Sequence, residues 1–201
     1  MPDLVLLSGG LDSAVNAALS AEAGPLGALL FVDYGQPSAR EELRAAAAIA
    51  AWLGRDLSST RIHLPTAGSL ADGKAGVVAG RNLILLAHGV AWAASMGCDR
   101  VLIGATADDA NDYPDCRGAW VHAANDLCSQ AYGITVGAPL IWHFKPAVMA
   151  EAVRLGVPLA ALWTCYTPVY GEPCKGCAAC KRMATVMPVS AMTSNLSAEP
   201  A

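Results

Sequence analysis

A run of serine and glycine residues near the amino terminus has the composition of a phosphate-binding loop. It follows a short apolar segment at residues 4–7. Its six residues are Ser8, Gly9, Gly10, Leu11, Asp12 and Ser13. Glycines allow backbone N–H groups to approach phosphate oxygens closely, and the first turn of a following helix adds a positive dipole end. We expect Asp12 to hold a Mg²⁺ ion that phosphate oxygens share, because a bare carboxylate would repel them. The alternative interpretation is a glycine-rich turn in which Asp12 only caps a helix.

Four cysteines near the carboxyl end have the spacing of metal ligands. They are Cys165, Cys174, Cys177 and Cys180. The last three form a C-x-x-C-x-x-C run, in which Gly176 is expected to ease the turn. Four thiolates suit a closed, tetrahedral Zn²⁺ site with a structural role, whereas a 4Fe–4S cluster is the alternative, since such clusters also use this spacing. Zinc is favoured because Lys175, Lys181 and Arg182 can offset the thiolate charge.

The composition limits the class of protein. The chain has 201 residues, of which 54% are hydrophobic and 15% charged, enough for one folded domain at residues 1–188 with a flexible tail at 189–201. No apolar run reaches the roughly 20 residues that a membrane-spanning helix needs. The first residues lack the basic segment of a signal peptide, so we expect a cytoplasmic protein. A net charge of −4 argues against nucleic-acid binding and favours small-molecule ligands.

Short apolar segments alternate with helix-like segments along the chain. Strands are expected at residues 4–7, 28–32, 57–64, 100–103 and 134–136. Helices are expected at residues 13–23, 38–53, 81–96, 118–132 and 145–155. Ser38 and Glu41 have the spacing of a capping box at the start of the second helix. The alternation predicts an α/β fold with an open, mainly parallel sheet flanked by helices, and with a carboxy-terminal zinc-binding segment at residues 165–182.

Two irregular stretches interrupt this alternation and are expected to border the site. Residues 65–80 contain four glycines and one lysine, a composition that predicts a flap over the ligand. Residues 105–118 are rich in aspartate. In an open parallel sheet, ligands bind beyond the carboxyl ends of the strands, where both stretches would emerge.

The serine and glycine run resembles the PP-loop, S-G-G-x-D-S, of the N-type ATP pyrophosphatases. It has neither the Walker spacing nor the G-x-G-x-x-G spacing of dinucleotide-binding proteins. Members of the PP-loop superfamily cleave ATP between the α and β phosphates and transfer AMP to an oxygen atom of the substrate. The resemblance therefore implies adenylation, with ATP and Mg²⁺ as cofactors, in an adenine nucleotide alpha hydrolase-like fold.

Further motifs are similar to those of one family in that superfamily, the 7-cyano-7-deazaguanine synthases. They are the PP-loop, Tyr34-Gly35-Gln36, Gly80-Arg81-Asn82, Asp109 with Tyr113-Pro114-Asp115-Cys116-Arg117, and the four cysteines. The last two motifs discriminate this family from other PP-loop enzymes. The resemblance implies an ATP-dependent ligase that converts 7-carboxy-7-deazaguanine and ammonia to 7-cyano-7-deazaguanine through an acyl adenylate and an amide, a step of queuosine biosynthesis.

The resemblance and the chemistry of the residues together suggest individual roles. Catalytic roles are expected for Asp12, Arg81, Asp109 and Lys145. Substrate contacts are expected for Tyr34, Gln36, Asn82, Tyr113, Asp115 and Arg117. Cations are needed because a carboxylate that attacks the α-phosphate meets repulsion. Structural alternatives are a surface helix residue for Arg117, a plain turn for Tyr113-Pro114 and a solvated helix start for Lys145.

Departures from the family pattern leave the substrate open. Pro37-Ser38 stand where the family has a basic residue and a histidine, and Ala79 stands where it has proline. The alternatives are a ligase for another carboxylate or deazaguanine, an enzyme that stops at the amide, a tRNA-base-modifying PP-loop enzyme, and a zinc-ribbon interaction module with an inactive nucleotide site. Free ammonia is the simplest nitrogen source, and the sequence leaves a homodimer open.

Overall fold

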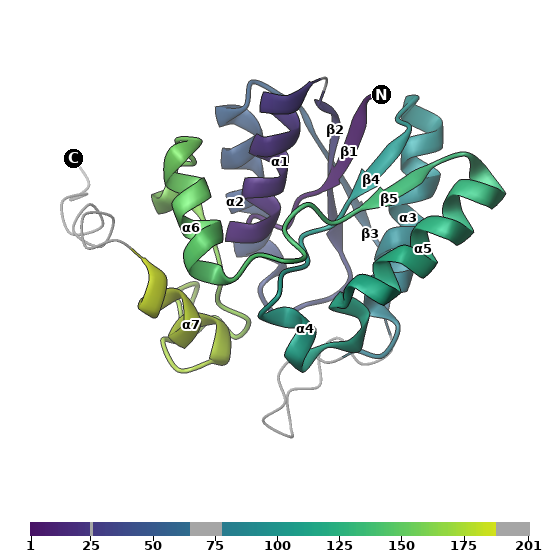
Figure 1. Cartoon of the computed structure of the whole chain (residues 1–201). Coiled ribbons are helices and arrows are strands. Elements are labelled where there is room, and N and C mark those ends of the chain that lie inside the picture. Colours follow the sequence, from purple (N-terminus) through teal and green to yellow (C-terminus); the bar gives the residue numbers. More distant parts are fainter. Residues whose placement is uncertain (25, 65–77, 188–201) are drawn as a thin grey trace.

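Five strands form one parallel sheet at the centre of the computed structural model (Figure 1). The structure describes residues 1–24, 26–64 and 78–187. The strands are β1 (Asp3–Leu6), β2 (Leu26–Asp33), β3 (Leu57–Arg61), β4 (Arg100–Leu102) and β5 (Thr135–Gly137). Their order is β3-β2-β1-β4-β5, and Leu4 of β1 lies opposite Ala28 of β2 and Val101 of β4. The connections reverse direction at β1, which places a ligand crevice beyond its carboxyl end.

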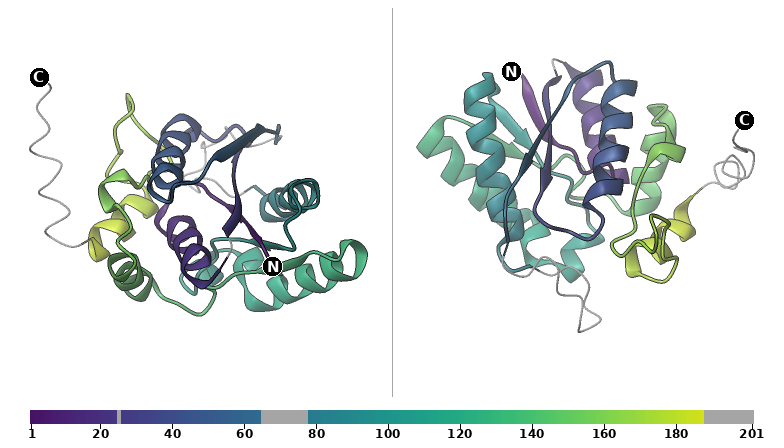
Figure 2. Two further views of the ribbon diagram at one scale, coloured as in Figure 1. Left: turned by 90° about the horizontal axis from the view of Figure 1, so that it is seen from above. Right: turned by 180° about the vertical axis from the view of Figure 1, so that it is seen from behind.

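Helices cover both faces of this sheet (Figure 2). One face carries α1 (Leu11–Ala23), α2 (Ala39–Trp52) and α6 (Lys145–Arg154). The other face carries α3 (Arg81–Met96) and α5 (Gly118–Tyr132). The predicted α/β class with an open parallel sheet is therefore confirmed.

Alternation along the central strands divides the core into two layers. Val5 and Leu7 pack against α1, whereas Leu4 packs on the side of α3 and α5. On β2, Phe31 faces the first layer and Leu30 the second, and all of these side chains are almost fully buried. Because successive strand residues point to opposite faces, a strand buried on both sides is apolar at every position. This explains why the sequence shows continuous apolar runs.

Several expected local features differ in the structure. Ser38 makes no capping bond to the α2 backbone, and its hydroxyl instead donates to the carboxylate of Glu42 at 2.6 Å, so the capping-box prediction is wrong. The strand expected at residues 57–64 ends at Arg61. The aspartate-rich stretch contains a short helix, α4 (Asp109–Asp112), and a 3₁₀ turn, η1 (Pro114–Cys116). After a second 3₁₀ turn, η2 (Leu159–Ala161), the cysteine segment ends in a helix that the sequence did not suggest, α7 (Ala178–Val186).

Two other predictions lie largely or wholly outside the described residues. The glycine-rich stretch at residues 65–80 is described only from residue 78, and the tail at residues 189–201 is not described. Among the helices that the structure describes, none is long and apolar enough to cross a membrane.

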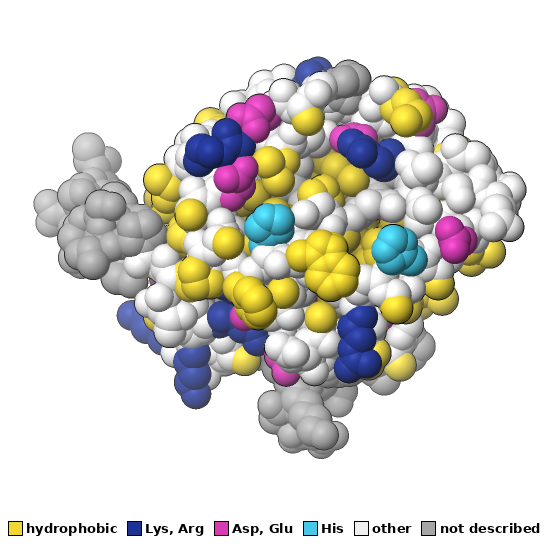
Figure 3. All heavy atoms as spheres, viewed as in Figure 1, with side chains coloured by type: hydrophobic (Ala, Val, Ile, Leu, Met, Phe, Trp, Pro, Cys, Tyr) yellow, Lys and Arg dark blue, Asp and Glu magenta, His cyan; other side chains and the backbone are white. Residues whose placement is uncertain are grey.

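Hydrophobic side chains gather near the centre of the face that Figure 3 shows. In the connection between β5 and α6, Trp142 is 75% exposed and Phe144 is 58% exposed. The ring of Trp142 lies over the start of α5, where a Cβ atom on Gly118 would stand only 3.0 Å from it. A larger residue at position 118 would therefore displace the indole ring.

A candidate active site at the carboxyl ends of the strands

A cavity of about 290 Å³ opens at the carboxyl ends of β1, β2 and β4. Most of the residues that the sequence motifs singled out line it. These are Ser8, Gly10, Leu11, Asp12, Ser13, Tyr34, Gln36, Arg81, Asn82, Asp109, Tyr113 and Lys145. Gly9, Asp115 and Arg117 are not among the lining residues. The fold thus brings together motifs that are far apart in the sequence.

The PP-loop is held in shape by its two serines. The Ser13 hydroxyl accepts a hydrogen bond from the backbone N–H of Ser8 at 3.2 Å and donates to the Gly10 carbonyl at 3.1 Å. Helix α1 begins directly after Gly10, which provides no side-chain cap. A Cβ atom on Gly10 would meet protein atoms only at 3.4 Å or more, so protein packing alone does not require glycine here. The loop therefore presents an uncapped helix start to the cavity, as an anion site requires.

Gly9 has a different physical role, because it faces the protein. Its φ of 80° lies in the left-handed region. A Cβ atom there would lie 2.7 Å from the Cβ atom of Ala45 and 2.7 Å from the carbonyl oxygen of Glu42. The Gly9 carbonyl also accepts a hydrogen bond from the backbone N–H of Trp163 at 3.0 Å. Glycine at this position permits α2 and the segment before the cysteines to pack against the loop.

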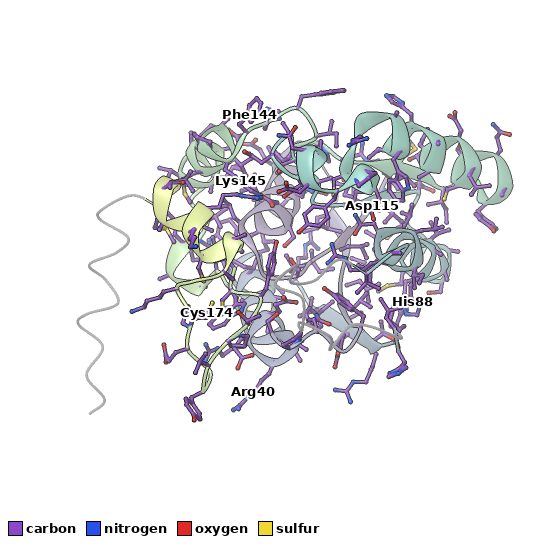
Figure 4. The ribbon with its side chains drawn as sticks, turned by 90° about the horizontal axis from the view of Figure 1, so that it is seen from below. Arg40, His88, Asp115, Phe144, Lys145 and Cys174 are labelled. Atoms are coloured by element: carbon purple, nitrogen blue, oxygen red, sulfur yellow. The ribbon has the colours of Figure 1, made fainter. Side chains whose placement is uncertain are left out.

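Asp12, Lys145 and Asp109 form a charged cluster at the floor of the cavity. Lys145, which Figure 4 labels, begins α6. Its side chain is only 13% exposed. Its ammonium group forms an ion pair with Asp12 and lies 3.7 Å from Asp109 Oδ2. Its backbone N–H donates to the carboxylate of Asp108 at 2.6 Å, which fixes the start of the helix. Lys145 is therefore not a solvated helix start, the alternative considered from sequence.

The second carboxylate oxygen of Asp12, Oδ1, is buried and has no hydrogen-bond partner among the described residues. Burial raises the pKa of this carboxyl group, and the nearby Lys145 ammonium opposes the shift. A buried carboxylate oxygen without a partner is costly unless a ligand satisfies it. A hard cation such as Mg²⁺ takes oxygen ligands, so the donor chemistry fits the predicted metal.

Arg182 reaches the same cluster from α7. Its guanidinium group lies 3.3 Å from Asp109 Oδ1 and 3.1 Å from Asp112 Oδ2. The other oxygen of Asp109 accepts a hydrogen bond from the Thr106 hydroxyl at 2.6 Å. The sequence suggested that Arg182 offsets thiolate charge, and the structure instead pairs it with these carboxylates. It joins the cysteine segment to the aspartate-rich stretch.

Tyr34 and Arg81 lie together on another part of the cavity wall. The guanidinium carbon of Arg81 lies 5.9 Å from the centroid of the Tyr34 ring, within range of a cation–π contact. Gln36 holds the adjacent turn, because its side-chain oxygen accepts from the Tyr34 N–H at 2.9 Å. Its amide nitrogen donates to the Glu42 carboxylate at 2.8 Å. The polar atoms of Gln36 are thus used within the protein, although the residue borders the cavity.

The Tyr113 to Arg117 motif is divided between the cavity and the surface. Tyr113 and Cys116 line the cavity, and burial raises the pKa of the Cys116 thiol to about 11. Asn82 donates weakly to the Asp115 carbonyl at 3.4 Å and thereby ties α3 to this turn. Arg117 is exposed and donates to the Ala110 carbonyl at 3.1 Å, which closes the turn from outside.

Sequence reasoning missed several residues that line the cavity. The polar ones are Glu42, Thr164, Tyr166 and Arg182. Burial raises the pKa of both the Glu42 carboxyl and the Tyr166 hydroxyl. Tyr166 directly follows Cys165, and Arg182 lies two residues after Cys180, so proximity to the metal-ligand motif was the available signal. Glu42 carries no such signal, because nothing in the sequence separates it from Glu41.

The four clustered cysteines form one thiol site (Figure 4 labels Cys174). The Sγ atoms of Cys165, Cys174, Cys177 and Cys180 all lie within 4.8 Å of one another. A tetrahedral zinc with bonds of about 2.3 Å places its sulfur atoms about 3.8 Å apart, so modest closure of this set suits the ion. The residue with positive φ in the turn is Lys175, at 57°, and not Gly176.

Hydrogen bonds to sulfur prepare this site for a cation. The backbone N–H of Cys177 donates to the Cys174 Sγ at 3.3 Å, and the Thr167 hydroxyl donates to the same atom at 3.3 Å. The Thr167 hydroxyl and the neighbouring N–H groups lower the pKa of Cys174 to about 6. The backbone N–H of Cys180 donates to the Cys177 sulfur, which caps α7. The cluster could hold a metal ion, because thiolates are the form that binds one.

Comparison with known protein families identifies the family of this chain. A family model described as "Queuosine biosynthesis protein QueC" matches residues 3–71 and 52–187. The chain belongs to the QueC family. This confirms the family that the sequence motifs suggested and, with it, the assignment as a ligase that uses ATP.

Curated members of the QueC family resemble the chain over most of its length. A 7-cyano-7-deazaguanine synthase from Synechococcus sp. (strain RCC307) is 38% identical in an alignment that covers 89% of this chain and 90% of the relative. The enzyme of the same name from Synechococcus sp. (strain CC9902) is 36% identical and covers 89% and 88%. A third, from Prochlorococcus marinus (strain MIT 9303), is 37% identical and covers 82% and 83%.

Solved structures agree with the PP-loop fold. An NMN synthetase from Francisella tularensis superposes with a TM-score of 0.53 at 18% identity and covers 95% of this chain and 80% of its own. The U34-tRNA thiolase NcsA from Methanococcus maripaludis, described with a [4Fe-4S] cluster, has a TM-score of 0.52 at 18% identity and covers 98% and 65%. At this level of identity the likeness concerns the fold alone.

Proposed function

We propose that the chain converts 7-carboxy-7-deazaguanine and ammonia to 7-cyano-7-deazaguanine with ATP, as the names of its QueC relatives indicate. The observation that carries the proposal is the cluster of Asp12, Lys145 and Asp109 beside the uncapped start of α1. This cluster lies in a cavity that also presents Arg81 and Tyr34. The two halves of the cavity suit a triphosphate and an aromatic carboxylate.

The PP-loop half binds ATP. Backbone N–H groups at the start of α1 bind phosphate oxygens, and Lys145 neutralises charge on the departing pyrophosphate. Asp12 would hold Mg²⁺, because its Oδ1 atom is buried without a hydrogen-bond partner in the described structure while Oδ2 pairs with Lys145. When bound, this ion supplies charge neutralisation to the phosphate oxygens. Asp109 orients Lys145 from the other side.

The second half binds the deazaguanine. Tyr34 and Tyr113 offer aromatic faces to a planar base. Arg81 attracts the carboxylate, one oxygen of which attacks the α-phosphorus while pyrophosphate leaves. Ammonia then attacks the acyl carbon and AMP departs, which gives the amide. For the nitrile, the amide oxygen attacks the α-phosphorus of a second ATP and pyrophosphate leaves. AMP then departs with that oxygen while the nitrogen loses two protons, which gives the C≡N bond.

The remaining predicted residues act indirectly in this proposal. Gln36 and Asn82 hold the turns that carry the aromatic residues, while Asp115 and Arg117 shape the turn before α5. The four thiols would hold Zn²⁺ in a closed site, which would contribute to folding rather than to chemistry. Free ammonia is the nitrogen source, and the enzyme acts in the cytoplasm.

One incubation tests the proposal. The protein is mixed with ATP, Mg²⁺, ammonium and 7-carboxy-7-deazaguanine, and the products are followed by mass spectrometry. We expect the amide first and then the nitrile, with AMP and pyrophosphate as the nucleotide products. Accumulation of the amide alone would limit the function to the first step. ADP and phosphate, or no turnover of this carboxylate, would overturn the proposal in favour of another substrate.

A further inference from the structure

Helix α7 carries groups of two kinds on different sides. Cys177 forms its cap and Cys180 lies in its first turn, and both sulfurs belong to the thiol cluster. Arg182 follows two residues later, which on a helix turns it by about 200° away from Cys180. Its guanidinium group reaches Asp109 and Asp112, which belong to α4. The same short helix therefore contacts the metal site and the phosphate site.

The position of α7 does not depend on Arg182 alone. Met183 and Val186, on the same helix, pack against the hydrophobic layer that contains α1 and α6. The cysteine cap fixes its first turn. With the helix held at these points, Arg182 is delivered to Asp109 as a consequence of the fold.

The two carboxylates that Arg182 contacts are not equivalent. The Asp112 side chain is 56% exposed, and ion pairs of this kind contribute little free energy. The Asp109 side chain is 14% exposed and also contacts Thr106 and approaches Lys145. The interaction with Asp109 is therefore the one that affects the site.

Charge balance shows what the interaction does. Lys145 lies between the carboxylates of Asp12 and Asp109, nearer to Asp12. Arg182 contacts Asp109 through Oδ1, whereas Lys145 approaches Oδ2. Removal of the guanidinium would leave Asp109 as a competing partner that draws Lys145 away from Asp12 and would add a negative charge near the phosphates.

We propose that Arg182 is a positioning residue for adenylation. It holds Asp109, and through Asp109 it keeps Lys145 on Asp12, so the metal-binding segment sets the geometry of the phosphate site. The inference rests on the proposed function only in that Lys145 and Asp12 are taken to serve the triphosphate. The contacts of Arg182 themselves come from the structure.

A double-mutant cycle on the zinc-loaded enzyme tests this proposal. The variants are Arg182→Met, Asp109→Asn and the two combined, with Lys181→Met as a control that removes the neighbouring, exposed charge. For Arg182→Met we expect kcat to fall about 10- to 100-fold, the range for residues that orient groups at a site, with KM for the deazaguanine unchanged within about twofold. Arg182→Lys should restore part of the rate, and Lys181→Met should behave as wild type.

The combined variant gives the decisive result. If Arg182 acts through Asp109, the double variant is no slower than Asp109→Asn alone. The reason is that Arg182 has no further effect on the rate once the Asp109 carboxylate is removed. Multiplicative losses would overturn the proposal and show that Arg182 contacts the substrate independently. Reduced melting temperature with unchanged kcat in Arg182→Met would also overturn it, because that outcome indicates a role only in anchoring α7.

A binding measurement separates this proposal from the identity of the substrate. The same proteins are titrated with Mg²⁺ and α,β-methylene-ATP by calorimetry, without any deazaguanine. We expect Arg182→Met to bind this analogue about 10-fold more weakly, with no further loss in the double variant relative to Asp109→Asn. If the wild type makes no nitrile while the variants still show the expected affinities for the ATP analogue, the proposed function fails and the positioning role of Arg182 stands. Equal affinity in wild type and Arg182→Met would overturn the positioning role.

Discussion

The two carboxylate oxygens of Asp12 have different surroundings. Lys145 pairs with one oxygen, and the other is buried without a partner in the described structure. Replacement by asparagine preserves size and removes the charge. We expect Asp12→Asn to fold and to lose about 10²–10³ in the rate of pyrophosphate release, the usual cost of one preorganised electrostatic partner. Undiminished release would show that this loop is not the catalytic phosphate site.

The same carboxyl group predicts how stability depends on pH. Burial raises the pKa of Asp12 in the ligand-free protein. A carboxyl group with a raised folded pKa contributes stability that is complete below its unfolded pKa and is lost as the pH rises through the folded value. The contribution of Asp12 to the unfolding free energy should therefore fall as the pH rises above the ordinary value of 3.8. Urea titrations at several pH values check this, and Asp12→Asn should show a smaller slope; an equal slope would contradict the assignment.

Glu42 is the cavity carboxylate for which no ion pair is described. It accepts hydrogen bonds from the Ser38 hydroxyl and the Gln36 amide, and burial raises its pKa. A guanine-type edge presents N–H donors that a carboxylate accepts well. We expect Glu42→Gln to raise KM for the deazaguanine about 10-fold, as loss of a charged hydrogen bond implies, and to leave KM for ATP unchanged.

Ser38→Ala is the matched control, because it removes one partner of Glu42 and lies outside the cavity lining. If both variants raise KM for the deazaguanine and KM for ATP by similar factors, the result would indicate that Glu42 only holds the Gln36 turn. The selective effect on the deazaguanine would then be absent.

At the scale of elements, helix α7 begins within the thiol cluster. Cys177 is both a thiol of the cluster and the cap of this helix. We expect Cys177→Ser to lose bound zinc, measured by metal analysis, and to lower the melting temperature by several degrees, because a closed metal site contributes folding free energy. A variant with full metal content or unchanged melting temperature would argue against a structural site. Visible absorbance in the wild type would favour the 4Fe–4S alternative.

The elements themselves were largely predictable, whereas the contacts between them were not. Apolar runs marked the strands because both faces of the sheet are covered, and the helix at residues 81–96 has the expected bounds. Helix α7 was missed because it has only nine residues and begins within the cysteine motif, which was interpreted only as a set of metal ligands. The pairing of Arg182 with Asp109 was missed because it joins segments far apart in the chain.

Residues of one sequence motif do not all have side chains that line the cavity. Tyr113 lines it, while Arg117 of the same motif lies on the surface. The turn at η1 rotates neighbouring residues to different sides, and the sequence does not encode that rotation locally. Gln36 was expected to contact substrate, yet its amide is used by the backbone of its own turn and by Glu42. Which partners these side chains contact is decided by the packing of the folded chain.

At the scale of the whole molecule, the exposed aromatic residues bear on assembly. Trp142 and Phe144 are both exposed in the connection before α6. Exposed apolar patches on soluble proteins commonly mark interfaces. We expect light scattering to give the mass of a homodimer, and Trp142→Ser with Phe144→Ser to shift it to one chain while the variant remains folded. A single-chain mass for the wild type would contradict this prediction, and Leu127→Ser, another exposed apolar position, serves as control.

The packing of Gly9 against α2 affects how inactive relatives can be recognised. A side chain at this position would collide with Ala45 and with the backbone of α2 whether or not ATP ever binds. A gene copy that had lost catalysis but kept the fold would therefore still be constrained to glycine here. Gly10 and Asp12 are free of that constraint, since a Cβ atom on Gly10 would make only ordinary van der Waals contact, and Asp12 Oδ1 has no hydrogen-bond partner among the described residues. Surveys of genomes for working and decayed copies should thus weigh Gly10 and Asp12, and should treat Gly9 as a mark of architecture only.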